Sequence, residues 1–285
     1  MMTMRRFRYG RLEIGYRTWG DPKNPPLLLL HGFTGSHRSW QEFALAVAPH
    51  YWVVAPDLPG HGASPAPNES EALSAAHTAE ALAALMSSLS SRRYDLIGYS
   101  FGGRIAYHLL SYHGSQIQSA VLESTSPGIE DPVVREERRR QDEHLAQEIQ
   151  ERGLDWFIPY WNHLPLFASQ ASLAEPRRQE QDDERRRHHA FGLAQSLRGA
   201  GTGTQGSLWS LLPTISIPLL IITGALDAKY SQIGGAMHAT SRQSQWVSVE
   251  GAGHNVHLER PEEFLRLVSQ FLSQSTYILE GMEQP

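Results

Sequence analysis

The chain has 285 residues, a hydrophobic content of 40%, a net charge of −5 and no cysteine. This length allows one large α/β domain or two small domains. The acidic balance argues against nucleic-acid binding, which usually goes with a basic face, and the lack of cysteine excludes disulfides, thiolate catalysis and cysteine-ligated metals.

Six short apolar runs in the first half of the chain are typical of strands, and two helical patterns lie among them. The segment "RLEIGYRTWG" alternates like a strand, and the residues just before it can form its hairpin partner. The later runs are continuously apolar, as expected for strands that are buried on both faces. In chain order we expect strands at residues 4–10, 11–20, 25–32, 51–60, 94–100 and 119–125, and helices at 78–91 and 101–114.

The end of the chain returns to the same rhythm. Strands are expected at residues 217–224 and 244–251, and an amphipathic helix at 260–274 has Pro261 in its first turn. Buried strands that alternate with helices favour a parallel sheet with helices on both faces. The sequence therefore predicts an α/β fold with a mostly parallel eight-stranded sheet.

Residues 127–205 break this rhythm, because the strands disappear and the sequence becomes charged and helical. We expect this segment to be a helical cap or lid, inserted into a core made of residues 1–126 and 206–285. Its last part, "GAGTGTQ", looks like a phosphate loop, but no strand precedes it. We therefore expect a flexible junction between lid and core at residues 199–205.

The segment "GYSFG" fits the G-x-S-x-G motif and lies between a predicted strand and a predicted helix. In this context the sharp turn exposes the serine hydroxyl at the carboxyl end of the sheet. Asp227 and His254 each follow a later predicted strand, so they are expected at the same edge. A serine hydroxyl needs a base, which His254 can supply, while Asp227 fixes the imidazole tautomer. The order Ser100, Asp227, His254 is that of the α/β-hydrolase fold.

Other residues compete for two of these roles. His257 lies three residues after His254, but glycines flank the turn that carries His254, so His254 is preferred. Asp57 and Glu123 are alternative acids, but they follow earlier strands and do not fit the order. His61 is expected to be a structural histidine.

The loop in "LLLLHGFTGS" offers the backbone N–H of Phe33, which can form an oxyanion hole with the N–H of Phe101. The 14 histidines include no H-E-x-x-H pattern and no carboxylate–histidine cluster of metal-binding spacing. We therefore predict no metal site and no cofactor.

Arg104 lies four residues after Ser100, which places both on one face of the predicted helix. A cation in the first turn of a helix opposes the helix dipole, at a cost of about 0.3–1 kcal/mol. Its guanidinium can bind a substrate carboxylate in a bidentate manner, or it can pair with a neighbouring acid. Every basic residue of the predicted lid is an arginine or histidine, with no lysine. An inward-facing lid arginine would complete an anion pocket.

Most of the chain resembles the 2-succinyl-6-hydroxy-2,4-cyclohexadiene-1-carboxylate synthases of menaquinone and phylloquinone biosynthesis, which are lyases of the α/β-hydrolase fold. Motifs such as "DLPGHG" and "GAGH" are shared with many fold relatives. The more specific resemblance lies in "GYSFGGRIAYHLL", "LESTSPGI", "VVREERRRQDEHLA", "YWNHLPLFASQ", "GLAQSLRGAGTGTQ" and "GALDAKY". The predicted lid contributes most of this specificity.

The resemblance implies roles for individual residues. Ser100, Asp227 and His254 match the catalytic triad of the family. The residues that match its substrate-binding positions are Tyr99, Arg104, Arg138, Trp161 and Arg185. Neighbouring arginines leave other registers open in the lid, namely Arg135, Arg139, Arg186 and Arg187. Members of the family often have an asparagine before the "GLA" stretch, where this chain has "RRRHHAFGLA". The assignment of Arg185 to the arginine of the family depends on how this segment is aligned.

The implied substrate is 2-succinyl-5-enolpyruvyl-6-hydroxy-3-cyclohexene-1-carboxylate, a small molecule with three carboxylates. Ser100, activated by His254, would abstract the ring proton next to the succinyl ketone, and the oxyanion hole would hold the enolate. Pyruvate would then leave, with the serine acting as a base and not as an acylated nucleophile.

Two alternatives remain at this point. A carboxylesterase or C–C bond hydrolase would share the triad and differ in the polarity of its lid, and a non-enzymatic ligand receptor can also use this fold. No membrane span, signal peptide or nucleic-acid partner is predicted, so a cytoplasmic location is expected. The sequence makes no prediction of oligomeric state.

Overall fold

The computed structural model describes residues 4–282, and the side chains of residues 4–274. Within this part of the chain, eight strands form one sheet in the order β1-β2-β4-β3-β5-β6-β7-β8. The pairs β1/β2 and β2/β4 are antiparallel and all other pairs are parallel. The strands are β1 (Arg5–Tyr9), β2 (Leu12–Trp19), β3 (Pro26–Leu30), β4 (Trp52–Pro56), β5 (Tyr94–Tyr99), β6 (Ile117–Glu123), β7 (Leu219–Gly224) and β8 (Ser244–Val249). The predicted mostly parallel eight-stranded sheet is confirmed.

Both faces of the sheet are covered, because successive side chains of a strand point to opposite sides. In β3, Leu28 and Leu30 join the core with helices α2, α3 and α7, whereas Leu27 and Leu29 join the core with α1 and α9. This explains why the central strands are apolar throughout. The helices around the sheet are α1 (Gln41–Val47), α2 (Ala75–Leu89), α3 (Phe101–His113), α7 (Ala228–Thr240), α8 (Val256–Glu259) and α9 (Pro261–Met282).

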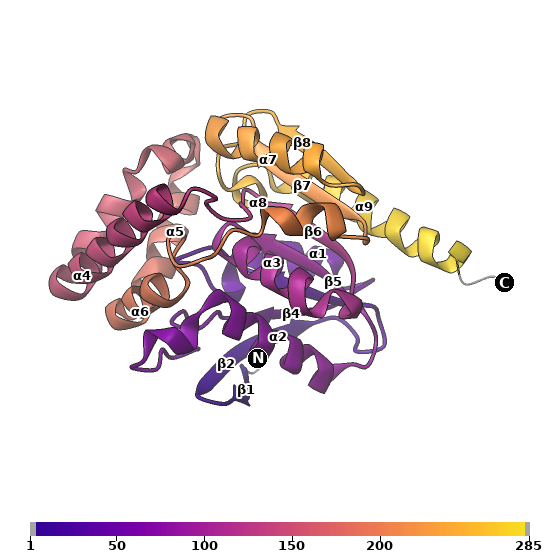
Figure 1. The fold of residues 1–285 in the computed structure, drawn as a ribbon, viewed down its shortest axis with the longest axis horizontal. Coiled ribbons are helices and arrows are strands. Elements are labelled where there is room, and N and C mark those ends of the chain that lie inside the picture. The colour runs from indigo at the N-terminus through magenta and orange to yellow at the C-terminus, as the bar shows by residue number, and fades with distance from the viewer. Residues whose placement is uncertain (1–3, 283–285) are drawn as a thin grey trace.

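Between β6 and β7 the chain forms α4 (Pro132–Asn162), α5 (Glu175–Arg186) and α6 (Ala190–Ala200), which lie together at one side of the molecule (Figure 1). The end of α9 projects at the opposite side. Helix α4 bends at Gly153, whose φ is 74°. Apolar side chains of α4 and α6 form a small core of their own, including Ile149, Phe157 and Leu193. Short 3₁₀ turns complete the chain: η1 (His37–Trp40), η2 (Ser70–Leu73), η3 (Gly114–Gln116), η4 (Pro165–Ser172) and η5 (Trp209–Thr214).

The glycine-rich segment at residues 199–205 is tightly packed, so the expectation of a flexible junction is wrong. Its first two residues complete α6. A Cβ on Gly203 would lie 2.2 Å from the backbone nitrogen of Arg139. The Gly203 N–H also donates to Asp142 at 2.9 Å. The glycines allow two backbones to approach closely, which is a packing role.

Candidate active site

Ser100 sits in a strained turn between β5 and α3. Its φ is 48°, in the left-handed region that residues other than glycine rarely adopt. The turn is possible because the neighbouring glycines leave room. A Cβ on Gly102 would lie 2.4 Å from the carbonyl oxygen of Leu30, and one on Gly98 would lie 2.8 Å from Gly103 Cα. The hydroxyl is thereby presented at the carboxyl end of the sheet, as the motif predicts.

The structure brings the three predicted triad residues together. Ser100 Oγ lies 2.9 Å from His254 Nε2, and His254 Nδ1 lies 2.7 Å from Asp227 Oδ2. Because the carboxylate can only accept, His254 donates its Nδ1–H to Asp227, and its Nε2 lone pair then faces the serine hydroxyl. The His254 side chain is buried, and the aspartate is fixed further by the backbone N–H of Tyr230 at 3.2 Å. This arrangement can take a proton from Ser100.

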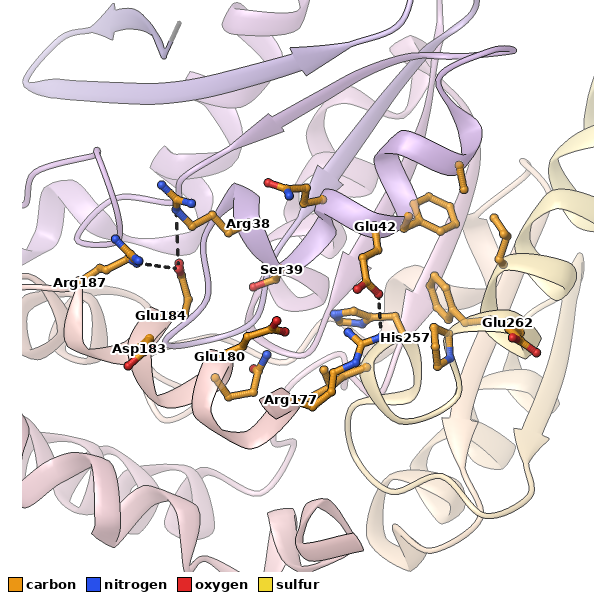
Figure 2. Close-up of a pocket in the computed structure, with 18 residues that line it drawn as sticks. Arg38, Ser39, Glu42, Arg177, Glu180, Asp183, Glu184, Arg187, His257 and Glu262 are labelled. Atoms are coloured by element: carbon orange, nitrogen blue, oxygen red, sulfur yellow. Dashed lines mark hydrogen bonds and ion pairs between the residues drawn. The ribbon is translucent and has the colours of Figure 1, made fainter. Parts of the chain in front are cut away.

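The competing residues form separate pairs. His257 Nδ1 lies 2.7 Å from Glu123 Oε2, and its ring stacks on Trp40 at 4.2 Å between centroids. Asp57 accepts from the backbone N–H of His37 and contacts its Nδ1, at 2.7 and 2.8 Å. His257 faces a different cavity of about 530 Å³, between α5, α1 and α9, which Ser100 does not line (Figure 2). The Glu123 carbonyl accepts from the Ser100 backbone N–H at 2.9 Å, but neither pair has a side chain bonded to the Ser100 hydroxyl.

Ser100 opens into a cavity of about 440 Å³. All ten residues predicted from the sequence line it: Phe33, Tyr99, Ser100, Phe101, Arg104, Arg138, Trp161, Arg185, Asp227 and His254. The backbone N–H groups of Phe33 and Phe101 have no hydrogen-bond acceptor within the described residues. Both are therefore free to stabilise an oxyanion.

The charge of this cavity is strongly one-sided. Four cationic side chains line it, and the only carboxylate among its described lining residues is Asp227, which is bound to His254. Trp161, Phe167 and Phe33 supply apolar wall. The cations are Arg104, Arg138, Arg185 and Lys229.

Arg104 is a buried cation without a carboxylate partner in the described part of the chain. It donates to the carbonyl of Ala200 at 2.7 Å and lies over the Phe101 ring at 5.1 Å. Burial lowers its pKa to about 10. The alternative in which Arg104 pairs with a neighbouring acid is therefore wrong. An anionic ligand would restore the charge compensation that the protein does not supply.

The lid arginines differ in whether they line the cavity. Arg138 lines the cavity and is held by Asp142 at 2.7 Å. Arg185 lines it as well, and its Nε is buried without a partner within the described residues. Burial lowers the pKa of Arg185. The four neighbouring arginines do not line the cavity and contact lid groups instead: Arg135, Arg139, Arg186 and Arg187.

Among the lining residues that sequence reasoning missed are Lys229 and Tyr230. They form the first turn of α7, and the Tyr230 ring packs on His254 at 4.6 Å between centroids. The Lys229 ammonium lies 5.6 Å from the centroid of the Tyr230 ring. Their position directly after Asp227 was the available signal. Within residues 4–282, no group of three or more His, Asp or Glu is arranged to hold a metal, and no helix is long and apolar enough to cross a membrane.

Two buried histidines make the stability of the protein depend on pH. Burial lowers the pKa of His31 and of His108 to about 4, whereas the unfolded chain takes up a proton near pH 6.5. Unfolding therefore becomes more favourable as the pH falls from about 6.5 to about 4, by up to about 3 kcal/mol for each group. We expect His108→Leu to lose less stability over this interval than the wild type, measured by urea unfolding at pH 7 and pH 5. An equal loss in both proteins would contradict this prediction.

This chain is similar in sequence to proteins of one family. The alpha/beta hydrolase fold family matches residues 25–261. A protein of Bacillus subtilis (strain 168), provisionally named a 2-succinyl-6-hydroxy-2,4-cyclohexadiene-1-carboxylate synthase, is 39% identical over 89% of this chain and 92% of its own length. The synthase of that name from Pectobacterium atrosepticum is 32% identical over 88% of this chain and 95% of its own length.

Solved structures agree with these sequence relatives. MenH from S. aureus superposes with a TM-score of 0.88 and 29% identity, over 92% of this chain and 98% of that one. An esterase from Thermogutta terrifontis superposes with a TM-score of 0.84 and 23% identity, over 96% of this chain and 99% of that one. The esterase likeness shows the fold alone.

Proposed function

Since this chain belongs to the 2-succinyl-6-hydroxy-2,4-cyclohexadiene-1-carboxylate synthase family of the alpha/beta hydrolase fold, we propose that it catalyses the reaction of that name in menaquinone or phylloquinone biosynthesis. The reaction eliminates pyruvate from 2-succinyl-5-enolpyruvyl-6-hydroxy-3-cyclohexene-1-carboxylate. The enzyme is a carbon–oxygen lyase.

The observation that best supports this substrate is the excess of positive charge beside the serine. Arg104 and Arg185 are both buried with incomplete pairing, and they share a cavity with Ser100. Carboxylates bind arginines through charge-assisted and often bidentate hydrogen bonds. A tricarboxylate can satisfy several of these cations at once, whereas a neutral ester would leave Arg104 without an anionic partner and Arg185 with only Asp182 at 3.3 Å.

The triad geometry supports a proton-abstraction mechanism. His254 takes the proton of Ser100, and the serine oxygen takes the ring proton next to the succinyl ketone. The electron pair of that C–H bond passes into the ketone, whose oxygen the N–H groups of Phe33 and Phe101 stabilise. As the enolate collapses, its electrons shift through the ring alkene to form the diene, and the bond from the ring to the enolpyruvyl oxygen breaks. His254 gives its proton to the released enolpyruvate, which becomes pyruvate, and the ring proton stays on the Ser100 oxygen.

The surrounding residues support positioning roles. Tyr99 and Trp161 line the cavity, and Trp161 packs on Phe33 at 5.3 Å between centroids. We propose that residues 127–205 act as a lid on a core of residues 1–126 and 206–285, because Arg138, Trp161 and Arg185 reach the cavity from this segment. We further propose a cytoplasmic location, which fits a chain without cysteine.

The test is pyruvate release from the enolpyruvyl cyclohexene substrate, followed with lactate dehydrogenase, beside hydrolysis of p-nitrophenyl butyrate. We expect rapid pyruvate release and slow ester cleavage. Fast ester cleavage without pyruvate release would contradict the proposal and favour the carboxylesterase or C–C bond hydrolase. Tight binding of the substrate without turnover would favour a receptor.

A further inference from the structure

His188 lies just after α5 and joins this segment to two loops of the core. The backbone N–H of Gly62 donates to His188 Nδ1 at 3.1 Å, and His188 Nε2 contacts the carbonyl oxygen of Thr34 at 2.8 Å. Its side chain is buried. Nδ1 must therefore hold the lone pair, and Nε2 must carry the hydrogen. Both contacts need the neutral ring in this one tautomer.

The loop that contains Thr34 also carries Phe33, whose N–H is the proposed oxyanion donor. Thr34 follows it directly and has a φ of 68°, a strained conformation that the surroundings must maintain. Within this loop, the Gly35 N–H donates to the Gly32 carbonyl at 3.0 Å. The contact from His188 to Thr34 O is thus one residue from the N–H group that the proposed reaction uses.

Other contacts between α5 and the core carry the rest of the lid attachment. Glu184 accepts from the Ser36 hydroxyl and lies 3.8 Å from Arg38 Nε. Arg177 binds Glu42 at 2.8 Å (Figure 2). Ser36 is the N-cap of η1, and the other side chains lie on η1, α1 and α5. Because they hold α5 in place, His188 can be replaced without releasing the lid.

We propose that neutral His188 is a positioning residue that holds the Phe33 N–H in its catalytic orientation through Thr34. The inference rests on the proposed function, because that reaction stabilises an enolate oxygen at this N–H. Displacement of a catalytic group by about 1 Å can cost up to about 10²-fold in rate. His188 acts through the loop and does not touch the substrate.

Protonation of His188 would break the arrangement, because both ring nitrogens would then donate and the Gly62 N–H would face another N–H. The titratable and charged groups around His188 are His31 and His61 from the core loops, Asp57, Glu184 and Arg185. Burial lowers the pKa of His188. The neutral ring therefore predominates at pH 7, and activity is expected to fall in acid as this group takes up a proton.

The test compares His188→Leu, which removes both hydrogen bonds, with His188→Gln, whose amide N–H can still reach Thr34 O. His189→Leu is the matched control, because His189 is exposed and makes no side-chain capping bond. We expect the Leu variant to lose about tenfold or more in kcat with KM within about threefold of the wild type. The Gln variant should keep most of kcat, and the control should match the wild type.

The pH profile separates positioning from a merely structural role. In the wild type, protonation of His188 contributes to the acid limb of kcat, whereas in His188→Gln this group is absent, so the limb should become less steep. An unchanged limb, or a Leu variant whose only defect is a raised KM, would overturn the inference. If the Leu variant fails to fold, the profile of the Gln variant still decides.

A second measurement keeps this inference distinct from the proposed function. A p-nitrophenyl phosphonate reacts with an activated serine through an oxyanion, whatever the natural substrate is. We expect His188→Leu to slow phosphonylation of Ser100 by about tenfold. If the wild type released no pyruvate but His188→Leu were still phosphonylated more slowly than the wild type, the proposed function would be refuted and the role of His188 retained. Phosphonylation at the wild-type rate would refute the role of His188.

Discussion

Ser100→Ala is expected to lower kcat for pyruvate release by about 10³-fold or more, with substrate affinity largely unchanged. The hydroxyl is the group that His254 Nε2 contacts at 2.9 Å, and alanine leaves no base next to the ring proton. The arginines that we propose to bind the substrate carboxylates are untouched by the substitution. Steady-state kinetics together with the Kd from calorimetry measures the two effects separately.

The second histidine–carboxylate pair provides the control for this experiment. His254→Gln should share the loss in kcat, whereas His257→Gln should not, because His257 contacts Glu123 and faces the other cavity. A large loss of kcat in His257→Gln that left the fold intact would reverse the assignment of the base. Acylation of Ser100 during turnover, seen as a mass increase of the protein, would replace proton abstraction by nucleophilic catalysis.

Arg104→Met is expected to raise the KM of the tricarboxylate substrate by about 30-fold or more, with a smaller effect on kcat. Loss of one partner of a buried charge pair typically costs about 2–5 kcal/mol, and Arg104 has no carboxylate partner in the described protein to take that role. The methionine keeps the apolar volume beside Phe101. The KM and the Kd of the unreacted substrate on a Ser100→Ala background are the measurements.

An arginine of the lid surface serves as the reference. Arg152 pairs with Glu148 at 2.8 Å and does not line the cavity, so Arg152→Met should leave KM within about twofold of the wild type. Circular dichroism should show that both variants are folded, since Arg104 also donates to Ala200 at the end of α6. An unchanged KM in a folded Arg104→Met protein would show that this cation does not bind the substrate.

The local patterns were sufficient to predict the sheet. Continuous apolar runs identify strands that are buried on both faces, and the order of strands and helices along the chain makes most of the sheet parallel. Outside the lid, the helices α1, α7 and the short α8 were missed. Helix α1 spans only seven residues. The sequence of α7 has little amphipathic pattern, and Gly234 and Met237 are the residues of this helix that are buried. Such helices depend on packing more than on local signals.

For the site, the motif and its context indicated the serine turn. The backbone approaches its neighbours too closely at Gly98 and Gly102 for any side chain, so these positions require glycine and the requirement is visible in the sequence. The order of residues along the chain indicated Asp227 and His254, since each follows a strand that ends at the same edge. These features are local or follow from the direction of the strands. The family resemblance added the substrate and the lid positions.

Only the tertiary structure decided which cations face the serine and what else surrounds them. Neighbouring arginines on one helix look equivalent in the sequence, but Arg138 and Arg185 line the cavity while the arginines beside them contact lid groups. The glycines at residues 199–205 proved to be packing positions, and His188 proved to connect two core loops to the segment after α5. The reason is that the sequence determines local geometry and strand order, whereas burial, pairing and charge compensation depend on contacts between residues far apart in the chain.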